Sequence, residues 1–129
     1  MASYGVSQDV IPGNLTIQGN LYQTAVQDGI VAKAGGGQQT TGSSVLNPAI
    51  NWFRVTTAAS PGDSVTLYPA TSGDEAEIRN DGASSINVFP AAGQNFNTGS
   101  ANAAFAVGAG KAVYLFCITS GTWLTNLSA

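Results

Sequence analysis

The chain has 129 residues, of which only 9% are charged, with seven acidic and four basic side chains and a formal net charge of −3. This length suits one domain with a two-layer core. The few, scattered cations exclude a basic surface for a nucleic-acid backbone, and no apolar run approaches the length of a membrane span. Histidine is absent and Cys117 is the only cysteine, so the commonest general base is missing and no intrachain disulfide can form.

The first 50 residues are rich in turn formers and poor in apolar side chains, with a Gly-rich breaker at residues 35–44. We expect residues 1–50 to form an extended N-terminal arm with short strands. The first residues also lack a secretory signal, so we expect synthesis in the cytoplasm. A Gly-Asn-Leu phrase occurs twice in the arm and places three apolar side chains on one side of an alternating pattern: Leu15, Ile17 and Leu21. Two copies are too few to build a stacked repeat, so a short strand pair or an interchain contact is expected there.

From Trp52 onward, short apolar alternations are separated by Gly, Asn, Asp and Ser. They predict seven strands, near residues 52–58, 63–69, 74–80, 84–90, 102–107, 111–119 and 122–127. Short strands with turns every eight to twelve residues are typical of all-β domains. We therefore predict an antiparallel β-sandwich or small barrel over residues 51–129; a jelly roll and an immunoglobulin-like sandwich fit this pattern equally well.

The alternation also assigns faces to the predicted strands. On the strand at 74–80, Ala76 and Ile78 point inward, while Glu75, Glu77 and Arg79 line the other face. The strand at 111–119 differs, because it is apolar on both faces. Such a strand lies either between two packed layers or in a subunit interface.

Apolar groups on the solvent side of a chain with little surface charge indicate self-association. Trp52 lies opposite the apolar face of Phe53 and Val55, and Phe89 lies opposite that of Ile86 and Val88. Together with the arm and the doubly apolar strand, these positions give the candidate interface residues: Leu15, Ile17, Leu21, Trp52, Phe89, Val113 and Leu115.

Side chains in patterns typical of catalysis are nearly absent. Glu75 and Glu77 are an acidic pair, as glycoside hydrolysis would need, but with Arg79 on the same face a solvated strand surface is the better interpretation. Asp63, Asp74 and Asp81 each stand near a Gly in a predicted turn, where a carboxylate caps its own backbone. We therefore predict no catalytic, cofactor-binding or metal-binding residues.

Two further features have competing interpretations. Cys117 stands inside an apolar strand with no basic neighbour, which favours a small buried hydrophobic residue over a reactive thiol. Tyr114 and Trp123 have the ring faces needed to stack on sugars, but core packing is the favoured interpretation of both.

Four stretches carry a resemblance to known proteins: Pro61–Thr71, Asp74–Ala83, Ile86–Ala91 and Gly108–Cys117. Over about residues 50–127 the chain is similar to a domain that recurs in structural proteins of tailed bacteriophages, including those of cyanobacteria. The Gly-Asn-Leu phrase resembles segments of phage fibre proteins. The resemblance implies a virion component with a trimeric or otherwise repeated β-rich module and no catalysis.

The leading hypothesis from sequence is a capsid decoration, or cement, protein on the outer surface of the virion, with the major capsid protein as partner and self-association as a trimer. A second hypothesis is a head-fibre, tail-fibre or adaptor module that binds host-surface glycans through Trp52, Phe89, Tyr114 or Trp123. A third, a small glycosidase that uses Glu75 or Glu77, is disfavoured by the missing histidine and the unclustered acids.

Overall fold

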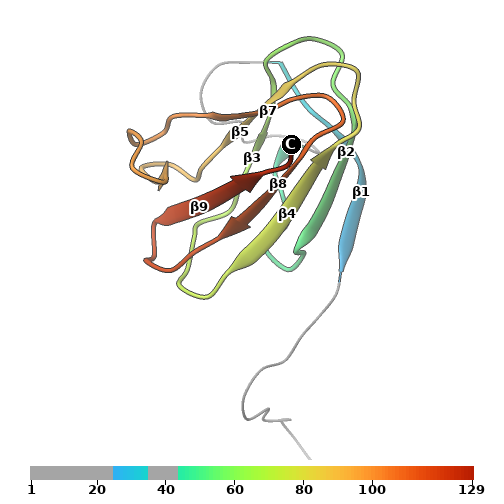
Figure 1. The fold of residues 1–129 in the computed structure, drawn as a ribbon. Helices are drawn as coiled ribbons and strands as arrows, with labels where there is room; N and C mark the ends of the chain where they lie inside the picture. The colour runs from blue at the N-terminus through green and yellow to red at the C-terminus, as the bar shows by residue number, and fades with distance from the viewer. Residues whose placement is uncertain (1–24, 35–43) are drawn as a thin grey trace, which may run out of the picture.

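The structure, a computed structural model, describes residues 25–34 and 44–129 (Figure 1). Within these ranges the chain forms strands joined by turns and bends, and it has no α-helix. The strands are β1 (Val26–Val31), β2 (Trp52–Thr57), β3 (Asp63–Thr66), β4 (Glu75–Asn80), β5 (Ile86–Phe89), β6 (Asn95–Phe96), β7 (Phe105–Val107), β8 (Ala112–Phe116) and β9 (Thr122–Leu127). The predicted all-β class is confirmed.

The strands form two sheets that enclose the core. One sheet has six strands in the order β1-β2-β4-β8-β9-β6, and the other has three in the order β3-β5-β7. In Figure 1, β3, β5 and β7 lie together on one side, and the ribbon of the larger sheet runs from β1 to β9 on the other. Buried side chains from both sheets, such as Val55 and Ile78 from one and Val65 and Val88 from the other, belong to one hydrophobic cluster. The arrangement is sandwich-like.

Successive strands alternate between the two sheets, so the first part of the chain winds like a short solenoid. From β2 the chain crosses to β3, returns to β4 beside β2, and crosses again to β5 beside β3. β2 and β4 pair in parallel, with Trp52 opposite Glu77, and β3 and β5 pair in parallel, with Asp63 opposite Ile86. Among the described strands, β1–β2 and β6–β9 are also parallel, whereas β4–β8, β5–β7 and β8–β9 are antiparallel. The expected purely antiparallel pairing is therefore wrong, and the sheets are mixed.

Parallel pairing follows from turns that lead from one sheet to the other and do not fold a strand back on its neighbour. The turn after β4 lies directly against the residue that follows β2: a Cβ at Gly82 would stand 2.7 Å from both the Cβ and the backbone nitrogen of Ala58. Backbone bonds join the same region, since Asp81 N–H donates to Val55 O and Ser84 N–H donates to Ala58 O. Only glycine permits this close approach.

The side chain of Asn80, which has no exposed surface, holds the turn after β4 in place. Its amide nitrogen donates to Ser84 O at 2.9 Å and to Val107 O at 3.0 Å, and its Oδ1 accepts from Gly82 N–H at 3.0 Å. One buried amide thus satisfies three backbone groups in the turn and in β7, as buried polar groups require.

Aromatic side chains from both layers pack at the centre. Tyr68 lies 5.6 Å from Trp123 in an edge-on arrangement and 6.4 Å from Phe53, measured between ring centroids. Burial, with a smaller contribution from the Asp74 charge, raises the pKa of Tyr68 to about 12. Trp123 is completely buried, so its predicted core role is confirmed.

All seven strands predicted from residue 52 onward are present, each somewhat shorter than or equal to its predicted range. β1 and β6 were not predicted as strands of this domain. β1 lies inside the expected arm, yet Ile30 in this strand and Ala32 just after it are buried. Leu46, which precedes β2 in the chain, is buried as well. The described parts of residues 1–50 therefore contribute to the same core as residues 51–129, while Leu15, Ile17 and Leu21 lie outside the described residues.

Replacing Asn80 by Ala should lower the free energy of unfolding by about 2–4 kcal/mol, because it removes the partner of two buried backbone groups, Gly82 N–H and Val107 O, and of a partly buried one, Ser84 O. Urea unfolding monitored by tryptophan fluorescence measures the loss. Asn126→Ala is the matched control, since Asn126 is exposed and its removal should change stability by less than about 0.5 kcal/mol. Equal stability of the two variants would contradict the role assigned to Asn80.

Candidate functional site

The outer face of the six-stranded sheet carries a row of side chains that the strand register aligns. Val26 lies opposite Trp52, Trp52 opposite Glu77, Glu77 opposite Tyr114, and Tyr114 opposite Asn126. Residues next to them in the chain, Phe53, Ile78 and Val113, point into the core and are buried. Because side chains alternate along a strand, burying the second set places the first set outside.

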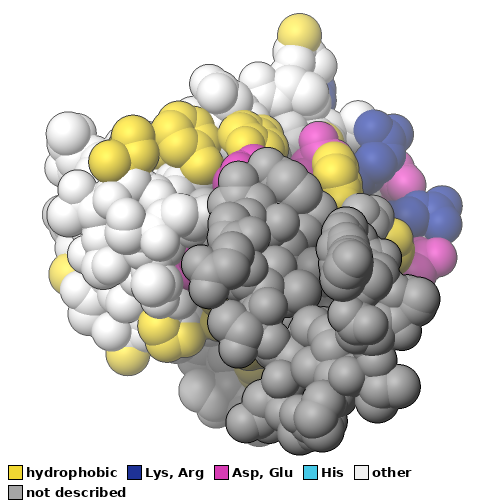
Figure 2. All heavy atoms as spheres, turned by 90° about the horizontal axis from the view of Figure 1, so that it is seen from below, with side chains coloured by type: hydrophobic (Ala, Val, Ile, Leu, Met, Phe, Trp, Pro, Cys, Tyr) yellow, Lys and Arg dark blue, Asp and Glu magenta, His cyan; other side chains and the backbone are white. Residues whose placement is uncertain are grey.

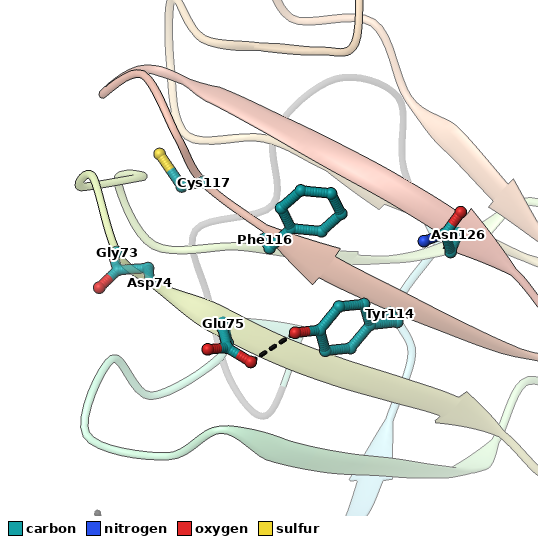
Figure 3. Close-up of a pocket in the computed structure, with 7 residues that line it drawn as sticks. All are labelled: Gly73, Asp74, Glu75, Tyr114, Phe116, Cys117 and Asn126. Carbon is teal, nitrogen blue, oxygen red and sulfur yellow. Dashed lines mark hydrogen bonds between the residues drawn. The ribbon is translucent and has the colours of Figure 1, made fainter.

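A groove with a volume of about 420 Å³ lies at the β8 end of this row (Figure 3). Gly73, Asp74 and Glu75 line it from the start of β4, Tyr114, Phe116 and Cys117 from β8, and Asn126 from β9. A smaller hollow of about 40 Å³ adjoins it and is lined by Trp52 and Glu77 among others. Glu75 and Tyr114 line both, so the two depressions form one continuous surface, which we call the aromatic groove.

Two aromatic rings and a carboxylate form the middle of the aromatic groove. The rings of Tyr114 and Phe116 have centroids 5.7 Å apart and an interplanar angle of 28°, and the Tyr114 hydroxyl donates a hydrogen bond to Glu75 Oε1 (Figure 3). That hydrogen bond raises the pKa of Tyr114 above its ordinary value, because the ionised phenol would lose it and stand beside a carboxylate. The bond also fixes the orientation of both side chains.

A cluster of ion pairs lies further along the same sheet face. Arg54 Nε and Arg79 Nε each donate to one oxygen of Asp81 at 2.8 Å, and Arg54 also lies 3.5 Å from Asp28. The hydrogen bond from Arg54, together with Arg79, holds the pKa of the Asp81 carboxyl below its usual value. These arginines are engaged with Asp28 and Asp81, whereas no ion pair within the described residues involves Glu75 or Glu77.

Charge is sparse over the rest of the described surface. In the view of Figure 2, the visible Lys and Arg side chains gather mainly at one side among Asp and Glu, and most of the remaining described surface is uncharged. Within residues 25–34 and 44–129, no group of His, Cys, Asp or Glu side chains has an arrangement suited to a metal ion. No helix in the same ranges has the length and hydropathy to cross a bilayer.

Cys117 lies at the edge of the aromatic groove but turns its thiol inward. The side chain is 3% exposed, and Sγ donates to Thr119 O at 3.2 Å. Burial raises the pKa of the thiol above its ordinary value. The prediction that Cys117 is a small buried residue is confirmed.

The structure separates the candidate interface residues into core and surface. Val113 and Leu115 have no exposed surface and Phe89 is 7% exposed, so these three are core residues of the single chain and not surface residues. β8 is apolar on both faces because one face fills the core and the other carries Tyr114 and Phe116. Trp52, at 42% exposed, is the only described candidate interface residue on the surface.

Of the four residues considered for glycan contact, Phe89 and Trp123 are buried, whereas Trp52 and Tyr114 share one face. The preference for Tyr114 in the core was wrong, because the opposite face of β8 fills the core. Phe116, Asp74 and Asn126 were not predicted as site residues. Strand alternation links Phe116 to Tyr114, but the contribution of Asn126 depends on the pairing of β8 with β9, which the sequence does not reveal.

Comparisons with protein-family models, with curated proteins and with solved structures find no match to this chain.

Lowering the pH should weaken the native state through Asp81. Its folded pKa is depressed, so its contribution is present above the unfolded value of about 3.9 and is lost as the pH falls through the folded pKa. Thermal unfolding of the wild type and of Asp81→Asn between pH 7 and pH 2 tests this. The wild type should be the more stable protein near neutrality, and the difference should shrink toward pH 2; a difference independent of pH would refute the assignment.

Cys117 should react slowly in the native protein. Burial of the side chain and the raised pKa both reduce the concentration of accessible thiolate. Iodoacetamide labelling at pH 8, followed by mass spectrometry, should be far slower without denaturant than in 6 M guanidinium chloride (about the concentration that unfolds most domains). Similar rates under the two conditions would show that the thiol is accessible in the folded chain.

Proposed function

We propose that this chain is a virion structural protein, a capsid decoration or cement protein that binds the outer capsid shell of a tailed bacteriophage and stabilises it. The observation that carries the proposal is the resemblance over residues 50–127. The stretches that resemble phage structural proteins contain all of β3, β4, β5 and β8, with turns around them. They include the buried residues Val65, Ile78, Val88 and Val113, so the resemblance concerns the core that defines this fold.

The surface of the domain supports a role in contacts with other chains. Several large apolar side chains are exposed, including Val26, Trp52 and Ile118 at 62%, 42% and 64%. With charged residues at only 9% of the chain, little electrostatic repulsion opposes close packing of many copies. The proposal includes self-association as a trimer and assigns no catalytic residue.

Stabilisation of the shell would follow from mass action. A protein that binds the assembled lattice better than the free capsid subunits shifts the equilibrium toward the lattice, by an amount that grows with its concentration relative to Kd. The residues that precede β1 are the proposed contact with the major capsid protein, and the sandwich would remain on the outer surface.

Removal of residues 1–24 should abolish binding to capsids that lack the protein, while the sandwich keeps its unfolding temperature. The cut has to end before β1, because Ile30 and Ala32 belong to the core and a longer deletion would destabilise the domain itself. Co-sedimentation with purified capsids measures binding, and circular dichroism during heating measures stability.

The control is the full chain with Thr98→Ala, which changes an exposed polar side chain outside both the deleted segment and the exposed apolar set, and which should leave capsid binding unchanged. Unaltered sedimentation of the truncated chain with capsids would eliminate the proposed attachment. Absence of the chain from purified particles, measured by mass spectrometry against the major capsid protein, would eliminate the virion role as a whole.

A further inference from the structure

We propose that the aromatic groove on the outer face of the six-stranded sheet binds a pyranose ring of a neutral glycan. Trp52, Tyr114 and Phe116 would contact the C–H face of the sugar, and Glu75, Asp74 and Asn126 would bind its hydroxyl groups. This inference goes beyond the proposed shell-binding function and does not depend on it, because none of these residues lies in the segment proposed to contact the capsid.

The aromatic side chains are the first step of the argument. Phe53, Phe96 and Trp123 are buried and are the large aromatic side chains of the core. Trp52 and Tyr114 are instead 42% and 36% exposed, and both flank Glu77 on one row. Exposed aromatic side chains gathered on one face, beside a groove, are typical of binding surfaces.

The size and lining of the groove fit a small polar ligand. Its volume of about 420 Å³ is within the range of small-molecule sites, about 300–1,000 Å³. Such sites combine apolar walls with a few polar groups that fix the orientation of the ligand. Here the rings of Tyr114 and Phe116 supply the apolar wall, and side chains from β9 and from the start of β4 supply the polar groups (Figure 3).

The polar groups match the hydrogen-bonding needs of sugar hydroxyls. A hydroxyl both donates and accepts, a carboxylate accepts only, and an amide does both. The Tyr114 hydroxyl donates to Glu75 Oε1, so Glu75 Oε2 can accept from a ligand. Thr71 N–H donates to Asp74 Oδ2 at 2.9 Å, so Asp74 Oδ1 can do the same. The Asn126 side chain makes no hydrogen bond within the described part of the chain and lines the groove. Oriented acceptors and one amide thus surround the rings.

The charge of the groove selects against anionic ligands. Asp74, Glu75 and Glu77 lie in or beside it, while Arg54 and Arg79 on the same sheet face are paired with Asp81. A phosphate, a uronic acid or a sialic acid would meet uncompensated carboxylates. The hydroxyls of a neutral sugar would donate charge-assisted hydrogen bonds to these carboxylates.

An organic cation is the competing ligand for an acidic site with aromatic side chains. Cation recognition places several ring faces around one point. The rings of Tyr114 and Phe116 instead stand nearly parallel along one strand, with an interplanar angle of 28° and centroids 5.7 Å apart. This arrangement presents ring faces in one direction, which suits the flat face of a sugar better than the sphere of a quaternary ammonium group.

The test is binding of the full chain to an array of neutral, sialylated and uronic-acid oligosaccharides, followed by titration calorimetry with the best neutral ligand. We expect selective binding of neutral glycans that persists in 0.5 M NaCl (a Debye length of about 4 Å). Trp52→Ala and Phe116→Ala should each weaken the affinity about tenfold or more, and Glu75→Gln should weaken it without removing an aromatic ring. Ile118→Ala is the matched control. Ile118 is an exposed apolar residue that follows β8 and lies outside the groove, so this variant should bind the glycan as the wild type does.

Backbone amide chemical shifts of the wild type, recorded during titration with the same oligosaccharide, keep the test decisive if a variant fails to fold. Shifts confined to the residues of β2, β4, β8 and β9 that line the groove support the site. Three outcomes overturn the inference: no neutral glycan binds at millimolar concentration, binding is unchanged in Trp52→Ala and Phe116→Ala, or the groove binds only organic cations and releases them in high salt.

Discussion

The buried amide of Asn80 fixes the register on which both layers depend. Asn80 ends β4, its backbone bonds reach Lys111 O and Gly110 N–H ahead of β8, and its side chain bonds the turn toward β5 and the carbonyl of Val107 in β7. A slip of β4 by one residue would exchange its buried and exposed faces. It would also separate these hydrogen-bond partners. The alignment of Trp52, Glu77 and Tyr114 on the outer face therefore rests on a polar contact in the interior.

The two ends of the outer sheet face differ in how their charged side chains are paired. Arg54 and Arg79 are engaged with Asp81 at one end of the sheet, whereas Glu75 bonds a tyrosine hydroxyl at the other. The first cluster contributes to folding near neutral pH. The second leaves carboxylate oxygens beside exposed rings, an arrangement that adds little to stability because surface contacts of this kind are weak. The two ends of one sheet face thus carry different chemistry.

Sequence reasoning recovered the strands from residue 52 onward because alternation and turn residues are local signals. It missed β1, whose Asp28-Gly29 irregularity interrupts the alternation, and it missed β6, which has only two residues. Parallel pairing was missed for another reason: a turn such as Ser60–Gly62 has the same composition whether it closes a hairpin or crosses between sheets. Local sequence specifies that the chain turns, but tertiary packing decides toward which sheet.

The aromatic groove was beyond the reach of the sequence for the same reason. Its residues come from β2, β4, β8 and β9, and only the pairing of these strands brings Trp52, Tyr114 and Asn126 into one row. The pattern of β8 correctly separated Tyr114 and Phe116 from Val113 and Leu115, but it gave no means to decide which set faces the core. At an exposed strand position, threonine has a β-propensity similar to that of an aromatic residue. β-Propensity alone therefore does not account for rings at Trp52 and Tyr114, and this is why we propose a ligand for this face.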